Sequence, residues 1–306
     1  MKTVPKGAYP AMLTPFTLDG AIDYPAVKRL LKWYNDCGCT GVLALCASSE
    51  TTHLSLEERI ELGKFIMENK GNLTIIISGH VSDTLEDQLT ELNAMAALKP
   101  AALCLIVSRL NQNNETEDEF IVNIQTIMDG LDDKEIPLGF YEWPGPQNRS
   151  LSEKILKFCA DTERFVFLKE TSCRTEVIRA KIKAVEGSNF GIYNANSTLL
   201  LESLKDGAAG FCGIMGNYHA DLYQWLCDNF EKYPKEAERL SDYLGVMSAV
   251  TDHYPAAAKY CQHLYGAEMT TYCRKMDGLN MSEQNLYRVR QMETVANELR
   301  AWLKTL

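Results

Sequence analysis

Short apolar runs alternate along this chain with longer segments in which apolar residues recur at a helical spacing. The strands of a parallel sheet are buried on both faces and read as continuous apolar runs, whereas a surface helix buries only one stripe. The alternation is therefore typical of βα units around a parallel sheet. The runs that qualify as strands are residues 8–13, 41–45, 73–78, 102–107, 136–141, 165–169, 190–193 and 209–213.

The segments between these runs predict amphipathic helices, and one helix start carries a strong local signal. Ser55 precedes Leu56-Glu57-Glu58, the capping-box spacing in which a serine and a glutamate satisfy each other's backbone N–H groups. Helical periodicity covers residues 24–36, 56–69, 84–98, 116–128 and 152–160.

Eight βα repeats within about 230 residues fit a (β/α)8 barrel, or TIM barrel, whose usual length is about 250 residues. Beyond residue 230 the periodicity stays helical and no further strand candidate follows. The sequence therefore predicts an α/β protein with two parts. A TIM barrel over residues 1–229 carries the active site, and a C-terminal helical region over residues 230–306 adds three helices that pack on the barrel.

Composition narrows the partners of such a barrel. The 306 residues carry a net charge of −10, which argues against a nucleic-acid surface because affinity for phosphate backbones needs clustered lysine and arginine. No apolar run approaches the roughly 20 residues needed to cross a bilayer, and the N-terminus lacks the apolar stretch of a signal peptide. We expect a cytoplasmic protein whose ten cysteines are reduced, without a nucleic-acid or membrane partner.

Two residues stand at strand ends, where the catalytic groups of a TIM barrel lie. Lys169 closes the apolar run 165–168, and desolvation there lowers the pKa of a lysine toward that of a nucleophile. Tyr141 ends the neighbouring strand about 5 Å away and is a candidate for proton transfer. The alternatives are a lysine that extends to solvent or pairs with Glu170, and a tyrosine that merely packs at the rim. The residues alone leave both alternatives open.

A third candidate follows the second strand, where residues 45–55 are rich in small hydroxylated side chains. The N–H and O–H groups of this loop suit a carboxylate. A loop that only caps the next helix is the alternative.

The sequence does not point to a metal ion or a cofactor. The five histidines form no zinc-binding pattern. Gly207, Gly210, Gly213 and Gly216 lack the spacing of a dinucleotide-binding or phosphate-binding loop, and they predict close backbone packing near the eighth strand. We therefore expect neither a metal nor a cofactor.

Several segments, in their order and spacing, resemble the family of dihydrodipicolinate synthase and N-acetylneuraminate lyase. They are Leu13-Thr14-Pro15-Phe16, Ser48-Ser49-Glu50 with Leu54-Ser55 and Glu57-Glu58-Arg59, Tyr141-x-x-Pro144, Leu168-Lys169-Glu170-Thr171, and residues 207–210 leading to Asn217. The resemblance runs from about residue 8 to residue 216.

The resemblance implies roles for these residues. Lys169 becomes the lysine that forms a Schiff base and Tyr141 the phenol that transfers protons. Ala47, Ser48, Ser49 and Gly213 become the substrate-binding residues, with the loop holding the substrate carboxylate.

The implied function is a class I lyase or aldolase that acts on a small 2-oxo acid, either pyruvate or a 2-keto-3-deoxy sugar acid. It needs no cofactor, and its assembly is a homo-oligomer, a tetramer by family resemblance. The competing hypothesis is a catalytically silent barrel that binds a 2-oxo acid as a sensor or partner module.

Three departures from the synthase pattern bear on the substrate. Ala47 replaces a threonine of the loop, residues 107–110 lack the tyrosine found after the fourth strand, and Pro146 replaces an arginine. We therefore expect that the protein is not an efficient dihydrodipicolinate synthase. Arg109 and Arg149 lie near the gaps in sequence and are candidates to supply the missing charge.

Overall fold

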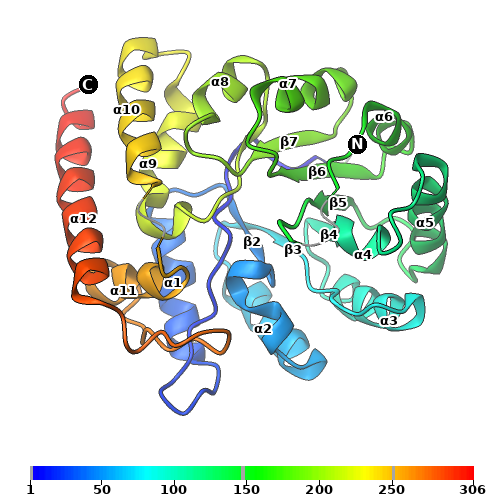
Figure 1. The fold of residues 1–306 in the computed structure, drawn as a ribbon, viewed down its shortest axis with the longest axis horizontal. Helices are drawn as coiled ribbons and strands as arrows, with labels where there is room; N and C mark the ends of the chain where they lie inside the picture. The colour runs from blue at the N-terminus through cyan, green and yellow to red at the C-terminus, as the bar shows by residue number, and fades with distance from the viewer. Residues whose placement is uncertain (1–2, 146–148, 250–251) are drawn as a thin grey trace.

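The computed structural model describes residues 3–145, 149–249 and 252–306. Its parallel strands form one sheet in the order β1-β8-β7-β6-β5-β4-β3-β2, and a parallel bridge between Ala11 and Leu43 joins the two ends. The predicted TIM barrel is confirmed (Figure 1). The strands are β1 (Gly7–Ala8), β2 (Gly41–Ala44), β3 (Thr74–Ile77), β4 (Ala102–Ile106), β5 (Leu138–Tyr141), β6 (Phe165–Glu170), β7 (Gly191–Asn194) and β8 (Gly210–Phe211).

The first strand is shorter than the predicted run 8–13. Pro10 follows β1 and has no N–H for the ladder. Single hydrogen bonds nevertheless join the segment after β1 to both neighbouring strands. Tyr9 N donates to Phe211 O of β8 at 2.8 Å, and Leu43 N of β2 donates to Pro10 O at 3.0 Å. The barrel is thus closed by single bonds around a proline rather than by a continuous ladder.

Helices surround the barrel, as Figure 1 shows. Ser55 caps α2 through the predicted capping box, because its hydroxyl accepts the N–H of Glu58 and the Glu58 carboxylate accepts the N–H of Ser55. The helices of this layer are α1 (Tyr24–Asp36), α2 (Leu56–Asn69), α3 (Leu85–Ala96), α5 (Glu117–Gly130), α6 (Glu153–Asp161), α7 (Thr175–Ala184), α8 (Leu200–Lys205) and α9 (Gly216–Asn229). Short helices η1 (Ala47–Ser49), η2 (Thr51–His53) and α4 (Val107–Leu110) follow β2 and β4.

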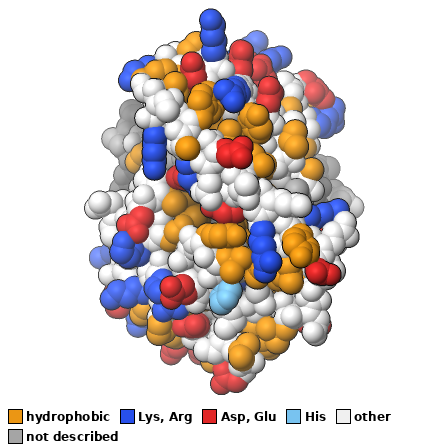
Figure 2. Space-filling view, turned by 90° about the vertical axis from the view of Figure 1, so that its left-hand side faces the viewer, with side chains coloured by type: hydrophobic (Ala, Val, Ile, Leu, Met, Phe, Trp, Pro, Cys, Tyr) orange, Lys and Arg blue, Asp and Glu red, His pale blue; other side chains and the backbone are white. Residues whose placement is uncertain are grey.

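Beyond α9 lie α10 (Pro234–Met247), α11 (Ala256–Tyr265) and α12 (Glu283–Leu303). Helix α10 contacts α8 and α9, and α11 and α12 contact α9 and each other. Figure 2 shows the face on which α12 lies, where hydrophobic side chains are interspersed with charges of both signs. Exposed hydrophobic residues of these helices include Tyr243, Val246 and Tyr287. Within the described ranges, no helix combines the length and the apolar character that a membrane span requires.

A buried ion pair ties the C-terminal helices to the loop after β2. Lys259 of α11 lies 2.7 Å from Glu50, and neither side chain is exposed to solvent. The second carboxylate oxygen of Glu50 accepts the backbone N–H groups of Arg274 at 2.7 Å and Lys275 at 2.9 Å, and Lys259 also donates to the Tyr272 carbonyl at 2.7 Å. Such satisfaction of every polar atom makes a buried charge tolerable.

The ion pair predicts a large stability loss when one partner is removed. Lys259→Met leaves the Glu50 carboxylate buried without its cation, so we expect the free energy of unfolding to fall by about 3–5 kcal/mol in urea titrations. Lys205→Met is the matched control, because Lys205 is partly exposed beside Glu202 and should cost at most about 1 kcal/mol. Equal losses in the two variants would contradict this account.

Candidate active site

Alternation along β6 places Lys169 inside the barrel. Phe167 packs in the lumen, with its ring 4.5 Å from that of Tyr193 and 5.9 Å from that of Tyr9. Side chains two residues apart on a strand point the same way, so Lys169 lies above Phe167 in the lumen. Only 3% of Lys169 is exposed, which excludes the alternative of a lysine that extends to solvent.

The other alternative, an ion pair between Lys169 and Glu170, is also wrong. Glu170 points to the opposite face of β6, where its carboxylate lies 2.9 Å from Lys181 of α7. Lys181 also lies 2.6 Å from Glu142, the residue after Tyr141. Behind the two candidate catalytic residues there is therefore a buried group of two carboxylates and one ammonium, Glu142, Glu170 and Lys181, here called the buried acidic triad. Its formal net charge is −1. Among the described side chains, none with a carboxylate pairs with Lys169.

Sequence reasoning missed this triad, because the residues that form it come from β5, β6 and α7. The only local signal is that two strand-end residues, Tyr141 and Lys169, are each followed by glutamate. Burial, the largest effect, raises the pKa of Glu142, and the nearby Lys181 opposes that rise.

Tyr141 is the neighbour of Lys169 across the strands. The two residues are partners in the β5–β6 register, and Lys169 Nζ lies 4.3 Å from the centre of the Tyr141 ring. Burial raises the pKa of Tyr141 to about 12, so the phenol keeps its proton at neutral pH. The hydroxyl is thereby a proton donor beside the amine.

The protonation of Lys169 follows from its neighbours. Burial, the largest effect, lowers the pKa of Lys169, but the ionised forms of Tyr141 and Cys212 raise it above its ordinary value overall. Burial also raises the pKa of Cys212 to about 12, as it does that of Tyr141. Both groups are thus neutral near pH 7, and the charges that raise the pKa of Lys169 are absent there. With those two charges absent, burial is the largest effect on Lys169, and it favours the amine that a nucleophile requires.

The loop after β2 brings Ala47, Ser48 and Ser49 into the short helix η1, where Ala47 packs against the lumen cluster that contains Tyr141. The Ser49 hydroxyl is occupied, because it donates to the Met12 carbonyl at 2.6 Å and accepts the Cys46 N–H at 3.2 Å. The first N–H groups of a helix have no acceptor within the helix, so those of Ala47 and Ser48 are available to an anion.

Ser48 lies beside a residue of the C-terminal helical region, Tyr254. The Tyr254 hydroxyl accepts from the Asn217 amide at 3.0 Å. Asn217 in turn accepts from the Tyr34 hydroxyl at 2.5 Å. Tyr254 was not predicted, because no local pattern marks a contact between residues so far apart in the sequence.

Gly213 follows β8 at the same end of the barrel. Its carbonyl accepts the Ala11 N–H at 3.2 Å. A Cβ there would lie 2.4 Å from the Phe211 ring and 2.5 Å from the Ala195 carbonyl, so only glycine fits. This agrees with the close backbone packing predicted from the glycine spacing.

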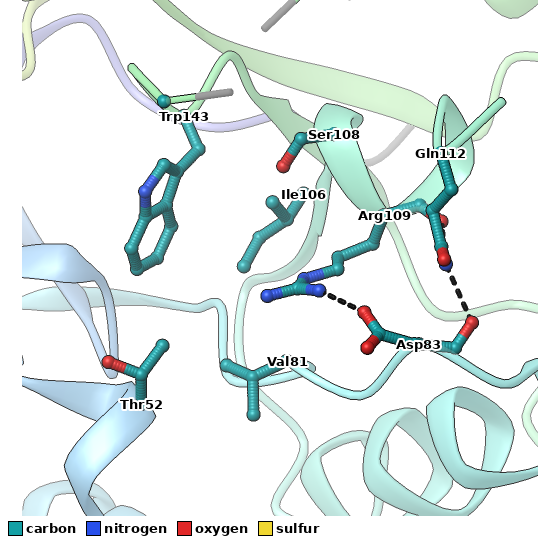
Figure 3. Close-up of a pocket in the computed structure, with 9 residues that line it drawn as sticks. Thr52, Val81, Asp83, Ile106, Ser108, Arg109, Gln112 and Trp143 are labelled. Atoms are coloured by element: carbon teal, nitrogen blue, oxygen red, sulfur yellow. Dashed lines mark hydrogen bonds and ion pairs between the residues drawn. The ribbon is translucent and has the colours of Figure 1, made fainter. Parts of the chain in front are cut away.

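A cavity of about 370 Å³ opens beyond the ends of β3, β4 and β5. Figure 3 shows the Trp143 indole and the Arg109 guanidinium on opposite sides of this space, with Ile106 between them. Ile106 is the register partner of Tyr141, and the Trp143 ring lies 5.3 Å from the Tyr141 ring. The cavity therefore adjoins the candidate catalytic pair. Its lining residues are Thr52, Val81, Asp83, Ile106, Ser108, Arg109, Gln112, Trp143 and Gly145.

The two candidate arginines differ in place. Arg109 lines the cavity and forms an ion pair with Asp83. Arg149 instead donates to the Asn111 side chain at 3.0 Å and to the Glu115 carbonyl, and it stacks over the Phe120 ring at 4.9 Å. Pro146, where the synthase pattern has arginine, lies outside the described residues.

Histidine does not form a metal centre in the described ranges, where no group of three or more metal-ligating side chains occurs. His80 is fully buried after β3, and its Nε2 accepts the Ile106 N–H at 2.5 Å. Burial, the largest effect, lowers the pKa of His80 to about 4. His80 is therefore a neutral ring that holds the end of β4 beside the cavity.

With this geometry established, comparison with known proteins identifies the family. The family model described as the dihydrodipicolinate synthetase family matches residues 4–291. The chain belongs to this family. The resemblance inferred from the sequence is thus confirmed, and the family is one of class I lyases and aldolases.

Relatives support the assignment over most of the chain. The 4-hydroxy-tetrahydrodipicolinate synthase of Leuconostoc mesenteroides is 25% identical over 247 residues, which cover 80% of this chain and 83% of that enzyme. A monomeric dihydrodipicolinate synthase variant has a TM-score of 0.87 at 17% identity and covers 97% of this chain and 98% of its own. YagE, a prophage protein of E. coli K12 solved in complex with pyruvate, has a TM-score of 0.81 at 19% identity, with coverage of 96% and 98%. At such identities the two structures show the shared fold alone.

His80 predicts how stability changes in acid. Its pKa is lower in the fold than the ordinary 6.5, so the unfolded chain binds a proton first. The stability that His80 contributes is complete above about pH 6.5 and is lost as the pH falls toward 4, by roughly 3 kcal/mol.

Urea unfolding of His80→Gln at pH 7.5 and pH 4.5 measures this effect. We expect the variant to lose roughly 2–3 kcal/mol less than the wild type between the two pH values. His263→Gln, at an exposed position, is the control and should keep the wild-type dependence. An unchanged dependence in His80→Gln would contradict the buried neutral ring.

Proposed function

We propose that this protein is a metal-independent class I lyase or aldolase in which Lys169 forms a Schiff base with a small 2-oxo acid. One observation carries the proposal. A lysine that is 3% exposed lies in the lumen without a carboxylate partner among the described residues, in contact with a neutral Tyr141. The family to which the chain belongs supports it.

The first step is condensation of the Lys169 amine with the 2-oxo group. The nitrogen lone pair attacks the carbonyl carbon, and the carbonyl oxygen leaves as water after it gains two protons, one from the amine and one from the Tyr141 phenol. The product is a cationic imine beside a Tyr141 phenolate. The buried acidic triad behind the two residues supplies a negative potential that favours this cation.

The cationic imine then acts as an electron sink. In aldol cleavage the Tyr141 phenolate takes the proton of the C4 hydroxyl, C4 becomes an aldehyde, and the electron pair of the C3–C4 bond forms the neutral enamine. Condensation is the reverse, and loss of a C–O substituent from the same enamine system gives dehydration. No metal ion is required for any of these steps.

The substrate carboxylate is assigned to the loop after β2 and the end of β8. The N–H groups of Ala47 and Ser48 begin η1, and the Ser48 side chain lies beside Tyr254. Gly213 permits close packing against Phe211 and the Ala195 carbonyl at the same end of the barrel, and Ser49 shapes η1 through its bonds to Met12 and Cys46. Four residues thereby act as the binding set, with Lys169 and Tyr141 as the catalytic pair.

We propose pyruvate or a 2-keto-3-deoxy sugar acid as the substrate, rather than the substrate pair of an efficient dihydrodipicolinate synthase. Residues 107–110 form α4 and contain no tyrosine that could exchange protons with Tyr141. Ala47 has no hydroxyl for this purpose either. Arg149 is committed to Asn111 and the Glu115 carbonyl. Pyruvate is the ligand of YagE in its solved complex, which supports a 2-oxo acid here by family likeness.

The proposal extends to assembly and location. We propose a homotetramer, which the family resemblance implies, located in the cytoplasm. Exposed hydrophobic side chains on α10 and α12, including Val246 at 76% exposure and Tyr287 at 52%, offer surface for such contacts.

Borohydride trapping tests the imine directly. With pyruvate and borohydride we expect an intact-mass increase of one reduced adduct, which peptide mapping assigns to Lys169. Lys169→Ala should abolish the adduct while circular dichroism shows an intact fold, and Lys154→Ala, at an exposed lysine, should trap like the wild type. A folded wild type that gives no adduct with any 2-oxo acid would favour the silent binding module. Turnover retained in Lys169→Ala would rule out the imine mechanism.

Tyr141→Phe tests the proton transfer. This change removes one hydroxyl and keeps the ring that packs against Trp143, so we expect turnover to fall roughly 10²-fold or more in a folded barrel. Single-turnover trapping should slow as well, because the leaving water loses its proton donor. An unchanged rate would make Tyr141 a packing residue only.

A further inference from the structure

A second cavity, of about 350 Å³, is enclosed by helices rather than by strands, and we call it the helix cavity. Its walls come from the end of α1, the first half of α9, and α11 and α12. Helices α9, α11 and α12 contact one another there, at the left of Figure 1. Among the described residues, none lines both the helix cavity and the space beyond β3 to β5. The helix cavity is therefore separate from the candidate active site.

The charged groups of the helix cavity leave one negative charge in excess. Asp221 and Glu293 supply two carboxylates, and Arg300 is the single guanidinium among the described lining residues. Every nitrogen of that guanidinium already donates. Arg300 Nε and Nη2 bind the two oxygens of Asp221 at 2.6 and 3.0 Å, and Nη1 binds Glu293 Oε1 at 2.6 Å. An incoming anion would have to displace a carboxylate from Arg300.

Two buried polar atoms in the cavity wall have no hydrogen-bond partner among the described residues. One is Glu293 Oε2, the carboxylate oxygen that Arg300 does not bind, and the other is the Tyr218 hydroxyl oxygen. Glu293 is 6% exposed and Tyr218 is 1% exposed. A buried polar atom without a partner costs free energy, so these two atoms require a partner that enters the cavity.

His219 does not supply the missing partner. Its ring is fully buried, and its Nδ1 lies 3.6 Å from Glu293 Oε2, which is too far for a hydrogen bond. Burial, the largest effect, lowers the pKa of His219 to about 3, so the ring is uncharged near neutral pH. Burial, the largest effect, also raises the pKa of Glu293, and Arg300 only partly offsets that rise. The Glu293 carboxylate thus lacks part of the positive charge that its burial requires.

We propose that the helix cavity binds a small primary ammonium ion with a short apolar stem. An ammonium has three N–H donors and no acceptor, which matches the unpartnered oxygens of Glu293 and Tyr218. Its charge balances the excess carboxylate. Trp33 and Tyr265 also line the cavity, and their rings suit the stem and the adjoining cation. This site is independent of any chemistry at Lys169.

Two rival occupants satisfy fewer of these groups. An anion meets a wall of net negative charge and a guanidinium that is already occupied. A neutral alcohol, or water, can donate to Glu293 and Tyr218 but leaves the buried charge unbalanced. The charge of the ligand head group therefore separates the three possibilities.

Three probes with the same butyl stem test the site. They are n-butylammonium, 1-butanol and pentanoate, whose head groups are positive, neutral and negative. The measurement is the Kd from ligand-observed NMR titrations of the full chain at constant ionic strength. For the wild type we expect one n-butylammonium ion per chain, with a Kd about tenfold or more below those of the other two probes, because its hydrogen bond to Glu293 is charge-assisted.

Four variants locate the bound ion. Glu293→Gln removes the charge and keeps an oxygen for Arg300, so it should raise the Kd of n-butylammonium about tenfold or more. Tyr218→Phe keeps every charge and removes one acceptor, so it should raise that Kd about threefold to tenfold. Glu298→Gln, at an exposed position of the same helix, is the matched control and should keep the wild-type Kd. Lys169→Ala should keep it too, because the lumen is a separate place.

The outcomes decide between a ligand site and a water-filled space, with circular dichroism as the check that each variant is folded. Absence of saturable n-butylammonium binding to the wild type leaves the cavity to water and overturns the proposal. Equal Kd values for the three probes, or a lower one for pentanoate, also overturn it. So does a wild-type Kd in folded Glu293→Gln or, if that variant does not fold, in Tyr218→Phe. Loss of binding in Lys169→Ala would assign the ion to the lumen instead.

Discussion

The candidate active site depends on the alternation of β6, which puts one ionisable residue on each side of a single strand. Lys169 faces a lumen filled by Phe167, Tyr9 and Tyr193, while Glu170 faces the helices and pairs with Lys181. Had the two residues shared a face, the carboxylate would have held Lys169 as an ammonium. Because the strand separates them, the lysine is left with neutral neighbours in a desolvated place, and the negative charge stays close enough to favour a cationic imine.

A buried charge also positions the loop after β2, which completes the candidate site. Glu50 anchors this loop to the C-terminal helical region through Lys259 and two backbone N–H groups, and Tyr254 from that region lies beside Ser48. The C-terminal helices are therefore part of the support of the proposed carboxylate site, and their loss would free the loop as well as expose the barrel. A buried ion pair suits this task, because its geometry tolerates few alternatives.

The barrel and the candidate pair followed from the sequence, because strand burial, helix periodicity and strand-end position are local properties. Strand β1 is shorter than predicted because of Pro10, whose effect on the hydrogen-bond ladder depends on the neighbouring strands. What local patterns could not reveal are contacts across long separations, such as Lys259 with Glu50, Tyr254 with Ser48 and Lys181 with both glutamates. The roles of Arg109 and Arg149 were open for the same reason, since only the fold decides which guanidinium reaches a cavity.

The residues of the candidate site differ in burial, and this difference decides which of them can be replaced at little cost in stability. Lys169 and Tyr141 are almost wholly buried, so substitution there changes the packing of the lumen and the chemistry together. The Arg109 and Asp83 side chains are 30% and 75% exposed. Arg109 lies in the short helix α4 after β4 and Asp83 in the loop after β3, where substitutions cost little stability. Departures from the synthase pattern at the cavity can thus occur while the proposed imine-forming centre stays intact. A barrel of this kind can change its substrate at the rim without rebuilding its lumen.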